Sequence, residues 1–167
     1  GIVGRFNAAA GTVSTDFETF KTSAANIIPP QMAGTIARSA GVTDSTGWCP
    51  IDAVSFESRL APNIHVIGDA AIAAPMPKSA FSANLQGKLC AIAAARLLSG
   101  LPAQSTALTN TCYSYTTPDT AVSITGVYRN DGGMFDQIKG AGGTSAVSNP
   151  LTSREAEAAQ AAAWFAA

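Results

Sequence analysis

The sequence predicts an α/β protein in two parts, and three observations support this fold class. Up to about residue 102, short apolar segments alternate with helical patterns, as in α/β folds. After residue 103 the chain is rich in Thr, Tyr, Val and Ser, with turn residues in between, which is typical of antiparallel strands. The final segment has the pattern of a helix. We therefore expect one domain over residues 1–102 and a second, α+β domain over residues 103–167.

The first part is expected to contain three short strands and one short helix. Residues 12–20 alternate apolar and polar side chains, as in a half-buried strand. Residues 51–56 have weaker strand character, whereas residues 63–67, NIHVI, form an apolar run typical of a buried strand. Residues 33–40 are expected to form a helix that ends at Gly41.

The longest helix is expected directly after Pro77. Its apolar stripe is spaced i, i+4, i+8, i+11, and the pattern predicts that this face is buried. Ser79 is the predicted N-cap, and Gly100 with Pro102 is predicted to end the helix. The stripe consists of Phe81, Leu85, Leu89 and Ile92.

The second part is expected to form a hairpin or meander followed by a helix. Residues 110–133 carry strand residues between two turn signals, at Pro118-Asp119 and at residues 130–133. Residues 140–150 are rich in Gly and Ser and are expected to form a loop. A helix is expected over residues 152–167, with Thr152 or Ser153 as its cap.

Composition makes several classes of partner and site unexpected. The 167 residues carry a net charge of -1 and no run of Lys or Arg, so nucleic acid is not an expected partner. No apolar run reaches about 18 residues, so no transmembrane helix is expected. With one histidine and no CxxC pair, a zinc site is not expected either. The start GIVGRFN falls in the middle of a pattern, so we expect this chain to be part of a longer protein.

Residues 63–88, NIHVIGDAAIAAPMPKSAFSANLQGK, form the most informative stretch. Gly68 permits a close backbone approach to a ligand, and Asp69 would accept hydrogen bonds from a polyol at the end of the strand. Ten residues on, the helix start at Ser79 offers unpaired N–H groups beside the charge of Lys78. This combination suits a group that becomes anionic. The alternative is that Gly-Asp is only a turn and Lys-Ser only a helix cap.

This stretch resembles the second FAD-binding motif of disulfide-reductase-like flavoproteins, most closely the flavoprotein subunit of flavocytochrome c sulfide dehydrogenase. NIIPPQMAG, GWCPID and NTCYSY match that family in the same order. The resemblance covers roughly residues 10–129 and continues more faintly to the end. It implies that residues 1–102 are the C-terminal part of a Rossmann-like FAD-binding domain, and that residues 103–167 are an interface domain.

The resemblance also implies roles for individual residues. Cys49, in GWCPID, matches one of two cysteines that form a redox-active disulfide over the flavin. Asp69 matches the acid that binds the FAD ribityl chain, and Trp164 matches an aromatic residue near the flavin. The implied cofactor-binding residues are Gly68, Asp69, Lys78, Ser79, Ala80 and Trp164, of which Lys78 and Ser79 lie beside the pyrimidine edge.

The implied function is the oxidation of sulfide through a cysteine pair and FAD, with electrons passed to a periplasmic c-type cytochrome subunit. The first dinucleotide motif, G-x-G-x-x-G, is absent, and neither Cys90 nor Cys112 matches the second redox cysteine. We therefore expect the missing N-terminal part of the flavoprotein to be a partner, and the fragment alone to be inactive. The alternatives are a sulfide:quinone oxidoreductase-like flavoprotein and a non-catalytic fragment that docks onto a partner subunit.

Cys90, Cys112 and His65 are expected to have structural roles. Cys90 lies on an alanine-rich helix, and Cys112 lies within a predicted strand, where packing explains a small thiol. The three tyrosines of the second part, Tyr113, Tyr115 and Tyr128, are expected to pack across strands.

Overall fold

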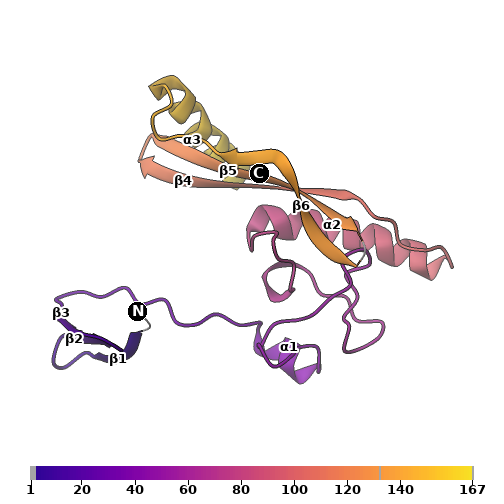
Figure 1. The fold of residues 1–167 in the computed structure, drawn as a ribbon, viewed down its shortest axis with the longest axis horizontal. Coiled ribbons are helices and arrows are strands. Elements are labelled where there is room, and N and C mark those ends of the chain that lie inside the picture. The colour runs from indigo at the N-terminus through magenta and orange to yellow at the C-terminus, as the bar shows by residue number, and fades with distance from the viewer. Residues whose placement is uncertain (1–2, 132, 167) are drawn as a thin grey trace. The chain divides into compact units, whose positions relative to one another are not determined.

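The computed structural model describes residues 3–131 and 133–166. The chain divides into two compact units, Gly1–Gln31 and Met32–Ala167 (Figure 1). The predicted domain boundary near residue 102 stays a prediction, because the division into compact units does not test it.

The first unit is a small antiparallel sheet of three strands in the order β1-β2-β3. Strand β2 (Thr12–Thr15) pairs with β1 (Val3–Asn7) on one side and with β3 (Thr19–Lys21) on the other. The prediction of one strand over residues 12–20 was therefore wrong in its extent. The hydroxyl oxygen of Thr15 accepts the backbone N–H groups of the next turn, which reverses the chain and leaves Phe17 88% exposed.

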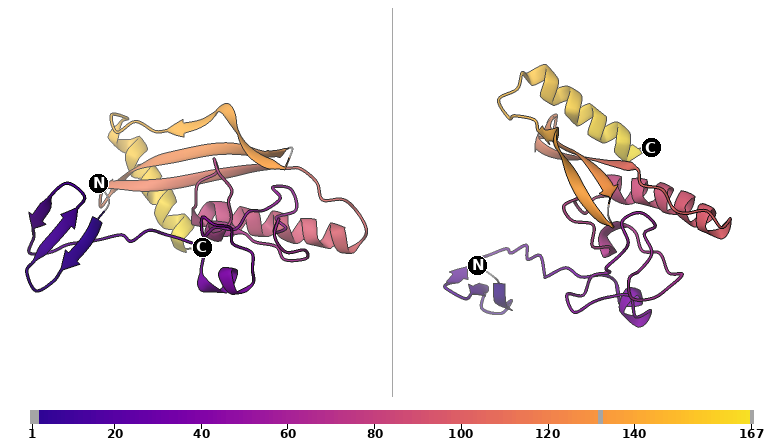
Figure 2. Two further views of the ribbon diagram at one scale, coloured as in Figure 1. Left: turned by 60° about the horizontal axis from the view of Figure 1, so that its bottom comes forward. Right: turned by 45° about the vertical axis from the view of Figure 1, so that its right-hand side comes forward.

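The second unit is built around an antiparallel sheet in the order β4-β5-β6. These strands span Ala107–Thr117, Thr120–Asp131 and Met134–Thr144. Helix α2 (Ala80–Leu98) contacts β4, and helix α3 (Leu151–Ala166) contacts mainly β5. The two helices cover opposite faces of the sheet (Figure 2). The predicted antiparallel strands and terminal helix are thus confirmed, and the chain has an α/β composition that is compatible with the predicted class.

Helix α2 begins and ends where its sequence predicts. The Ser79 hydroxyl accepts the Ser82 N–H at 3.0 Å, which satisfies one of the free donors of the first turn. At the other end, Gly100 has a φ of +72° and Leu101 donates back to the Arg96 carbonyl. The predicted apolar stripe is only partly correct, because Ile92 is 58% exposed and the buried residues are Ser82, Gln86 and Ala93.

Residues 51–56 and 63–67 do not form the predicted strands. The first segment makes no more than single contacts with the second, such as the Phe56 carbonyl that accepts the Val66 N–H, and His65 forms an isolated bridge with Glu57, just after the first segment. Asn63 has a φ of +64°, which interrupts an extended backbone at the start of the second segment. A buried strand needs a paired strand on each side, and the described residues supply only a single bridge partner for this segment.

The short elements deviate from prediction at their ends. The predicted helix over residues 33–40 is confirmed as α1 (Thr35–Ser39). The loop predicted over residues 140–150 begins later, because β6 continues to Thr144 and pairs with β5 through Gly142 and Gly143. Helix α3 starts at Leu151, so Thr152 and Ser153 lie inside its first turn and the carbonyl of Pro150 accepts the Ser153 N–H.

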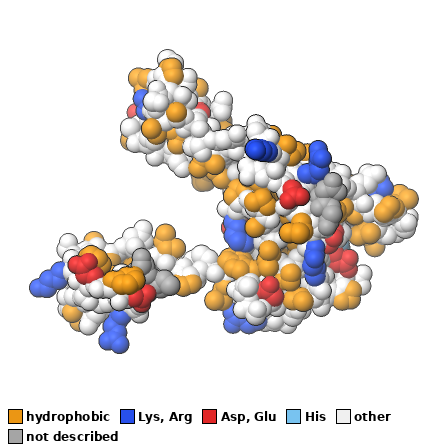
Figure 3. Space-filling model, in the orientation of Figure 1, with side chains coloured by type: hydrophobic (Ala, Val, Ile, Leu, Met, Phe, Trp, Pro, Cys, Tyr) orange, Lys and Arg blue, Asp and Glu red, His pale blue; other side chains and the backbone are white. Residues whose placement is uncertain are grey.

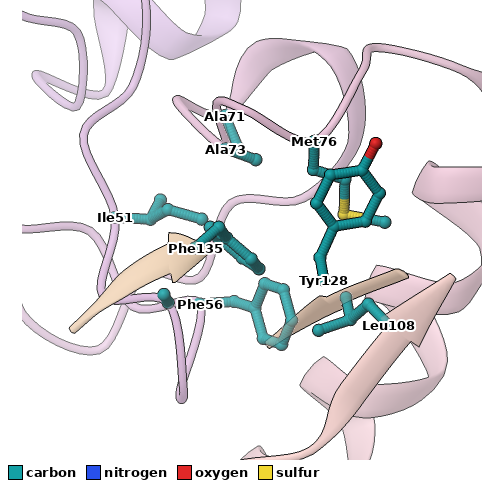
Figure 4. Close-up of a cluster of buried hydrophobic side chains, with 9 residues drawn as sticks. Ile51, Phe56, Ala71, Ala73, Met76, Leu108, Tyr128 and Phe135 are labelled. Atoms are coloured by element: carbon teal, nitrogen blue, oxygen red, sulfur yellow. The ribbon is translucent and has the colours of Figure 1, made fainter. Parts of the chain in front are cut away.

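The largest core cluster joins the irregular segment 51–76 to the three-stranded sheet (Figure 4). Phe56 and Leu108 have no exposed surface, and the Phe56 ring lies 6.2 Å from that of Phe135. Because sheet residues bury the irregular segment, its position depends on the sheet rather than on secondary structure of its own. The cluster consists of Ile51, Ala53, Phe56, Ala71, Ala73, Met76, Leu108, Tyr128 and Phe135.

The surface retains many apolar side chains. Ile36 and Leu98 are 81% and 90% exposed, and charged side chains are sparse among the apolar ones in the space-filling view (Figure 3). Within residues 3–131 and 133–166, no helix has the length and apolar character needed to cross a membrane.

We predict that replacing Leu108 by alanine destabilises the second unit by about 2–5 kcal/mol, because it removes a fully buried side chain and leaves a cavity. Urea unfolding followed by circular dichroism measures the change. The matched control is Leu98→Ala, at a leucine that is 90% exposed, where we expect a change within about 0.5 kcal/mol. Equal effects of the two substitutions would contradict the described core.

Candidate functional site

An open groove of about 560 Å³ brings together three of the predicted cofactor-binding residues, Ser79, Ala80 and Trp164. Its lining residues come from β4, an outer strand of the sheet, from the start of α2 and from the end of α3. Its volume falls in the range of small-molecule sites. The lining residues are Ser79, Ala80, Phe81, Thr111, Cys112, Tyr113, Tyr115, Ala161, Ala162, Trp164 and Phe165.

Aromatic contacts join the two helical walls of the groove. The Phe81 ring, in the first turn of α2, stacks on the Trp164 ring near the end of α3, with 5.9 Å between centroids and 29° between planes. Trp164 remains 43% exposed and Phe165 91% exposed. The groove therefore presents flat apolar surface beside a helix N-terminus, where backbone N–H groups and the positive end of the dipole favour negative charge.

Two tyrosines fix α3 against the sheet. The Tyr115 hydroxyl donates to the Ala158 carbonyl at 3.0 Å, and the Tyr113 hydroxyl donates to Gln160 at 3.3 Å. These residues alternate with Asn110 and Cys112 along β4, so the strand turns its odd positions toward α3 and its even positions toward α2. Tyr113 and Tyr115 therefore contact a helix as well as packing across strands.

A buried asparagine that the sequence reasoning missed connects α2 to β4. The Oδ1 atom of Asn110 accepts the hydroxyl of Ser79 at 2.6 Å and that of Ser82 at 3.0 Å. Its Nδ2 atom donates to the Cys112 sulfur at 3.4 Å. The available signal was an asparagine amid strand residues, because Asn is rare in strands unless it has partners.

The other predicted site residues form a second cluster next to the groove. The N–H of Cys49 donates to the Ala70 carbonyl at 2.9 Å, and the Cys49 carbonyl accepts the N–H of Ile72 at 2.8 Å. Lys78 donates from Nζ to the carbonyls of Asp69 and Ala71. The cluster thus ties GWCPID to the Gly68-Asp69 turn.

Gly68 and Asp69 belong to a short 3-10 helix, η1 (Gly68–Ala70), rather than to the end of a strand. Gly68 has a φ of +68°, and its N–H donates to Oε1 of Gln86 on α2 at 2.7 Å. Asp69 is exposed. Within the described part of the chain its carboxylate accepts no hydrogen bond, so it is available to a polar ligand.

Lys78 is held by contacts within the protein. Its Nζ lies 3.8 Å from the centre of the Trp48 ring, in addition to its two carbonyl acceptors. Partial burial lowers the pKa of Lys78, and the nearby charges of Asp69 and Cys49 oppose that shift. Lys78 thus connects the Cys49 segment, through the Trp48 ring, to the turn that contains Asp69.

The thiol of Cys49 is free and has no exposed surface. It packs with Ala33, Ala37 and Val42. Burial raises the pKa of Cys49, Asp44 raises it further, and the positive charge of Lys78 lowers it. A reactive cysteine is partly exposed and near positive charge. Cys49 meets only the second of these conditions in this chain.

The remaining cysteines and the histidine lie in different surroundings. Burial raises the pKa of Cys90, which packs against the main core from α2. Cys112 lines the groove and is half-buried. Nδ1 of His65 lies 2.9 Å from the Ser55 carbonyl, which agrees with a structural role.

We predict that iodoacetamide labels Cys49 more slowly than Cys112 in the native, reduced chain at pH 8. Cys49 is fully buried and burial raises its pKa, so its thiolate fraction is below that of an ordinary cysteine and grows only at higher pH. Peptide mapping by mass spectrometry measures both rates, and the chain unfolded in urea is the control. Rates that are equal in the native and unfolded states would contradict the buried position.

Residues 104–167 match the family model described as flavocytochrome c sulphide dehydrogenase, flavin-binding. The match covers less than half of the chain, from just before β4 to the end, and it includes every groove residue except Ser79, Ala80 and Phe81. This confirms the resemblance seen in the sequence and agrees with FAD as the cofactor. The family implies an oxidoreductase with a cytochrome partner. The C-terminal part of this chain, residues 104–167, is therefore similar to the flavin-binding part of the flavocytochrome c sulphide dehydrogenase family.

Proposed function

We propose that this chain is the C-terminal part of an FAD-dependent sulfide dehydrogenase, and that the groove holds the ring end of the flavin. One observation carries the proposal. The α2 start, which the sequence links to a flavin, and the segment that matches a flavin-binding family form opposite walls of one groove. The two signals come from separate parts of the chain and meet at the same place.

The groove suits a planar ring system with a polar edge. Aromatic side chains, among them Tyr113, Trp164 and Phe165, supply flat apolar contact area. The backbone N–H groups of Ala80 and Phe81, in the first turn of α2, lie where a helix has no internal acceptors. Together with the helix dipole they would stabilise negative charge on a bound ring. Bound FAD supplies the capacity to accept an electron pair.

In the proposed reaction the sulfur chemistry takes place at Cys49. Hydrosulfide attacks a disulfide that Cys49 forms with a cysteine outside this chain. The disulfide bond breaks, a new sulfur–sulfur bond forms on one cysteine as a persulfide, and the other cysteine leaves as a thiolate. Bound FAD would supply the acceptor for the electron pair that the thiolate and the persulfide together give up with one proton, which leaves the added sulfur bridging the two cysteines. Lys78 would stabilise the thiolate of Cys49, because its charge lowers the pKa of that thiol.

The whole protein would include the first dinucleotide motif and would pass electrons to a c-type cytochrome in the periplasm. These parts of the proposal rest on the family resemblance and on the family's description as a flavocytochrome c. A quinone-reducing relative would pass its electrons to a quinone, so the identity of the electron acceptor distinguishes that alternative from this proposal. A fragment that binds a cytochrome without any flavin would instead support a docking role.

We predict that this chain binds FAD and that Trp164→Ala weakens the binding roughly twofold to tenfold, the range expected for losing one aromatic stacking contact. Flavin absorbance during titration measures the affinity. The matched control is Phe20→Ala, at an aromatic residue in the first unit that is 48% exposed, against 43% for Trp164. A chain that ignores FAD, or an equal loss in both variants, would contradict the placement of the flavin in the groove.

We also predict that, in the full-length flavoprotein, Cys49→Ser abolishes bleaching of the flavin by sulfide while dithionite still bleaches it. Serine cannot form the disulfide that sulfide attacks, whereas dithionite reduces the flavin directly. Stopped-flow absorbance compares the two reductants. Cys90→Ser is the control, because that cysteine packs against the core and should leave both reactions unchanged. Reduction of Cys49→Ser by sulfide at the parent rate would rule out its proposed role.

A further inference from the structure

We propose that Asn110 is a positioning residue that fixes the first turn of α2 and the thiol of Cys112 as two walls of the groove. The expected effect on FAD binding rests on the proposed function, whereas the expected effect on Cys112 does not. Asn110 itself is 1% exposed and does not line the groove. It acts through neighbours that do.

The contacts of Asn110 use both ends of its amide. Oδ1 accepts two hydroxyls at the start of α2, from the cap residue Ser79 at 2.6 Å and from Ser82 in the first turn at 3.0 Å. Nδ2 lies 3.4 Å from the Cys112 sulfur, which is also 3.7 Å from Oδ1. Ser79 and Cys112 both line the groove, so one buried side chain holds a residue of each wall.

The network leaves no member unsatisfied. The Ser79 hydroxyl donates to Asn110 and accepts the Ser82 N–H, and so it serves as helix cap and cross-link together. Within the described residues, every buried side-chain nitrogen or oxygen has a hydrogen-bond partner. Removing Asn110 would leave the buried Ser82 hydroxyl without its acceptor, which favours rotation or displacement of the first turn.

The side chain at this position needs an acceptor for two hydroxyls and a donor for the sulfur, and an amide supplies both. Aspartate would keep the two acceptor bonds but would place a negative charge beside the thiol. Leucine has about the same size and supplies neither bond. The two substitutions therefore separate the anchoring of α2 from the electrostatics of Cys112.

The experiment measures the iodoacetamide labelling rate of Cys112 at pH 8 and the affinity for FAD, in the full chain. We expect Asn110→Asp to slow labelling on the order of tenfold, because the new carboxylate repels a second negative charge on the neighbouring sulfur, and to keep most of the FAD affinity. We expect Asn110→Leu to speed labelling at least threefold and to weaken FAD binding about tenfold, since both restraints are lost.

Asn130 provides a matched control. It is also 1% exposed, donates to the Ala53 carbonyl at 2.9 Å and accepts from Ser105 and Thr106, yet it does not line the groove. Asn130→Leu should destabilise the fold in a similar way but leave the labelling rate of Cys112 and the FAD affinity of the folded protein within about twofold. If Asn110→Leu does not fold, Ser82→Ala removes one anchoring bond from a residue outside the groove and should still weaken FAD binding about threefold.

The inference is overturned if Asn110→Leu, or Ser82→Ala in its place, changes the labelling rate of Cys112 and the affinity for FAD no more than Asn130→Leu does. A parent chain that does not bind FAD would contradict the proposed function alone. The labelling rate of Cys112 would then still decide the role of Asn110, because it requires no flavin.

Discussion

The close seating of α2 on the Gly68–Ala70 turn is the constraint on which the site depends. A Cβ atom on Gly68 would lie 3.3 Å from the Cβ of Ala83, and one on Gly87 would lie 3.3 Å from Cδ1 of Ile67. The φ of +68° at Gly68 further disfavours any side chain there. Because both positions are glycine, the helix lies close enough for Oε1 of the buried Gln86 to accept the Gly68 N–H, and this bond connects the helix to the turn.

This contact explains why the two clusters of site residues are neighbours. Lys78 and Ser79 are adjacent in the chain, but their side chains bind in different places, Lys78 to the turn and Trp48, and Ser79 to Asn110 on β4. The helix start therefore connects the buried thiol of Cys49 with the open groove. A shift of α2 would disturb both clusters at once, so the chemistry proposed for each depends on the same packing.

The sequence predicts those parts of the fold that local interactions decide. The Ser79 cap, the Gly100 end of α2 and the meander after residue 103 follow from short-range patterns, and the structure confirms them. The strand expected at residues 63–67 is absent because a strand depends on neighbours, which a local pattern cannot reveal. Asn110 was missed for the same reason, since its partners lie about 30 residues away along the chain.

The resemblance placed Lys78 at the flavin edge, and its contacts add a role that the sequence does not reveal. Its ammonium group is surrounded by two carbonyls and the Trp48 ring, next to the turn that binds the Cys49 backbone. Burial disfavours the thiolate of Cys49 and the Asp44 charge adds to that penalty, while the Lys78 charge opposes it. The contacts of Lys78 therefore hold the Cys49 segment in place. Its positive charge also favours the thiolate of Cys49, which is the form in which a cysteine leaves a disulfide.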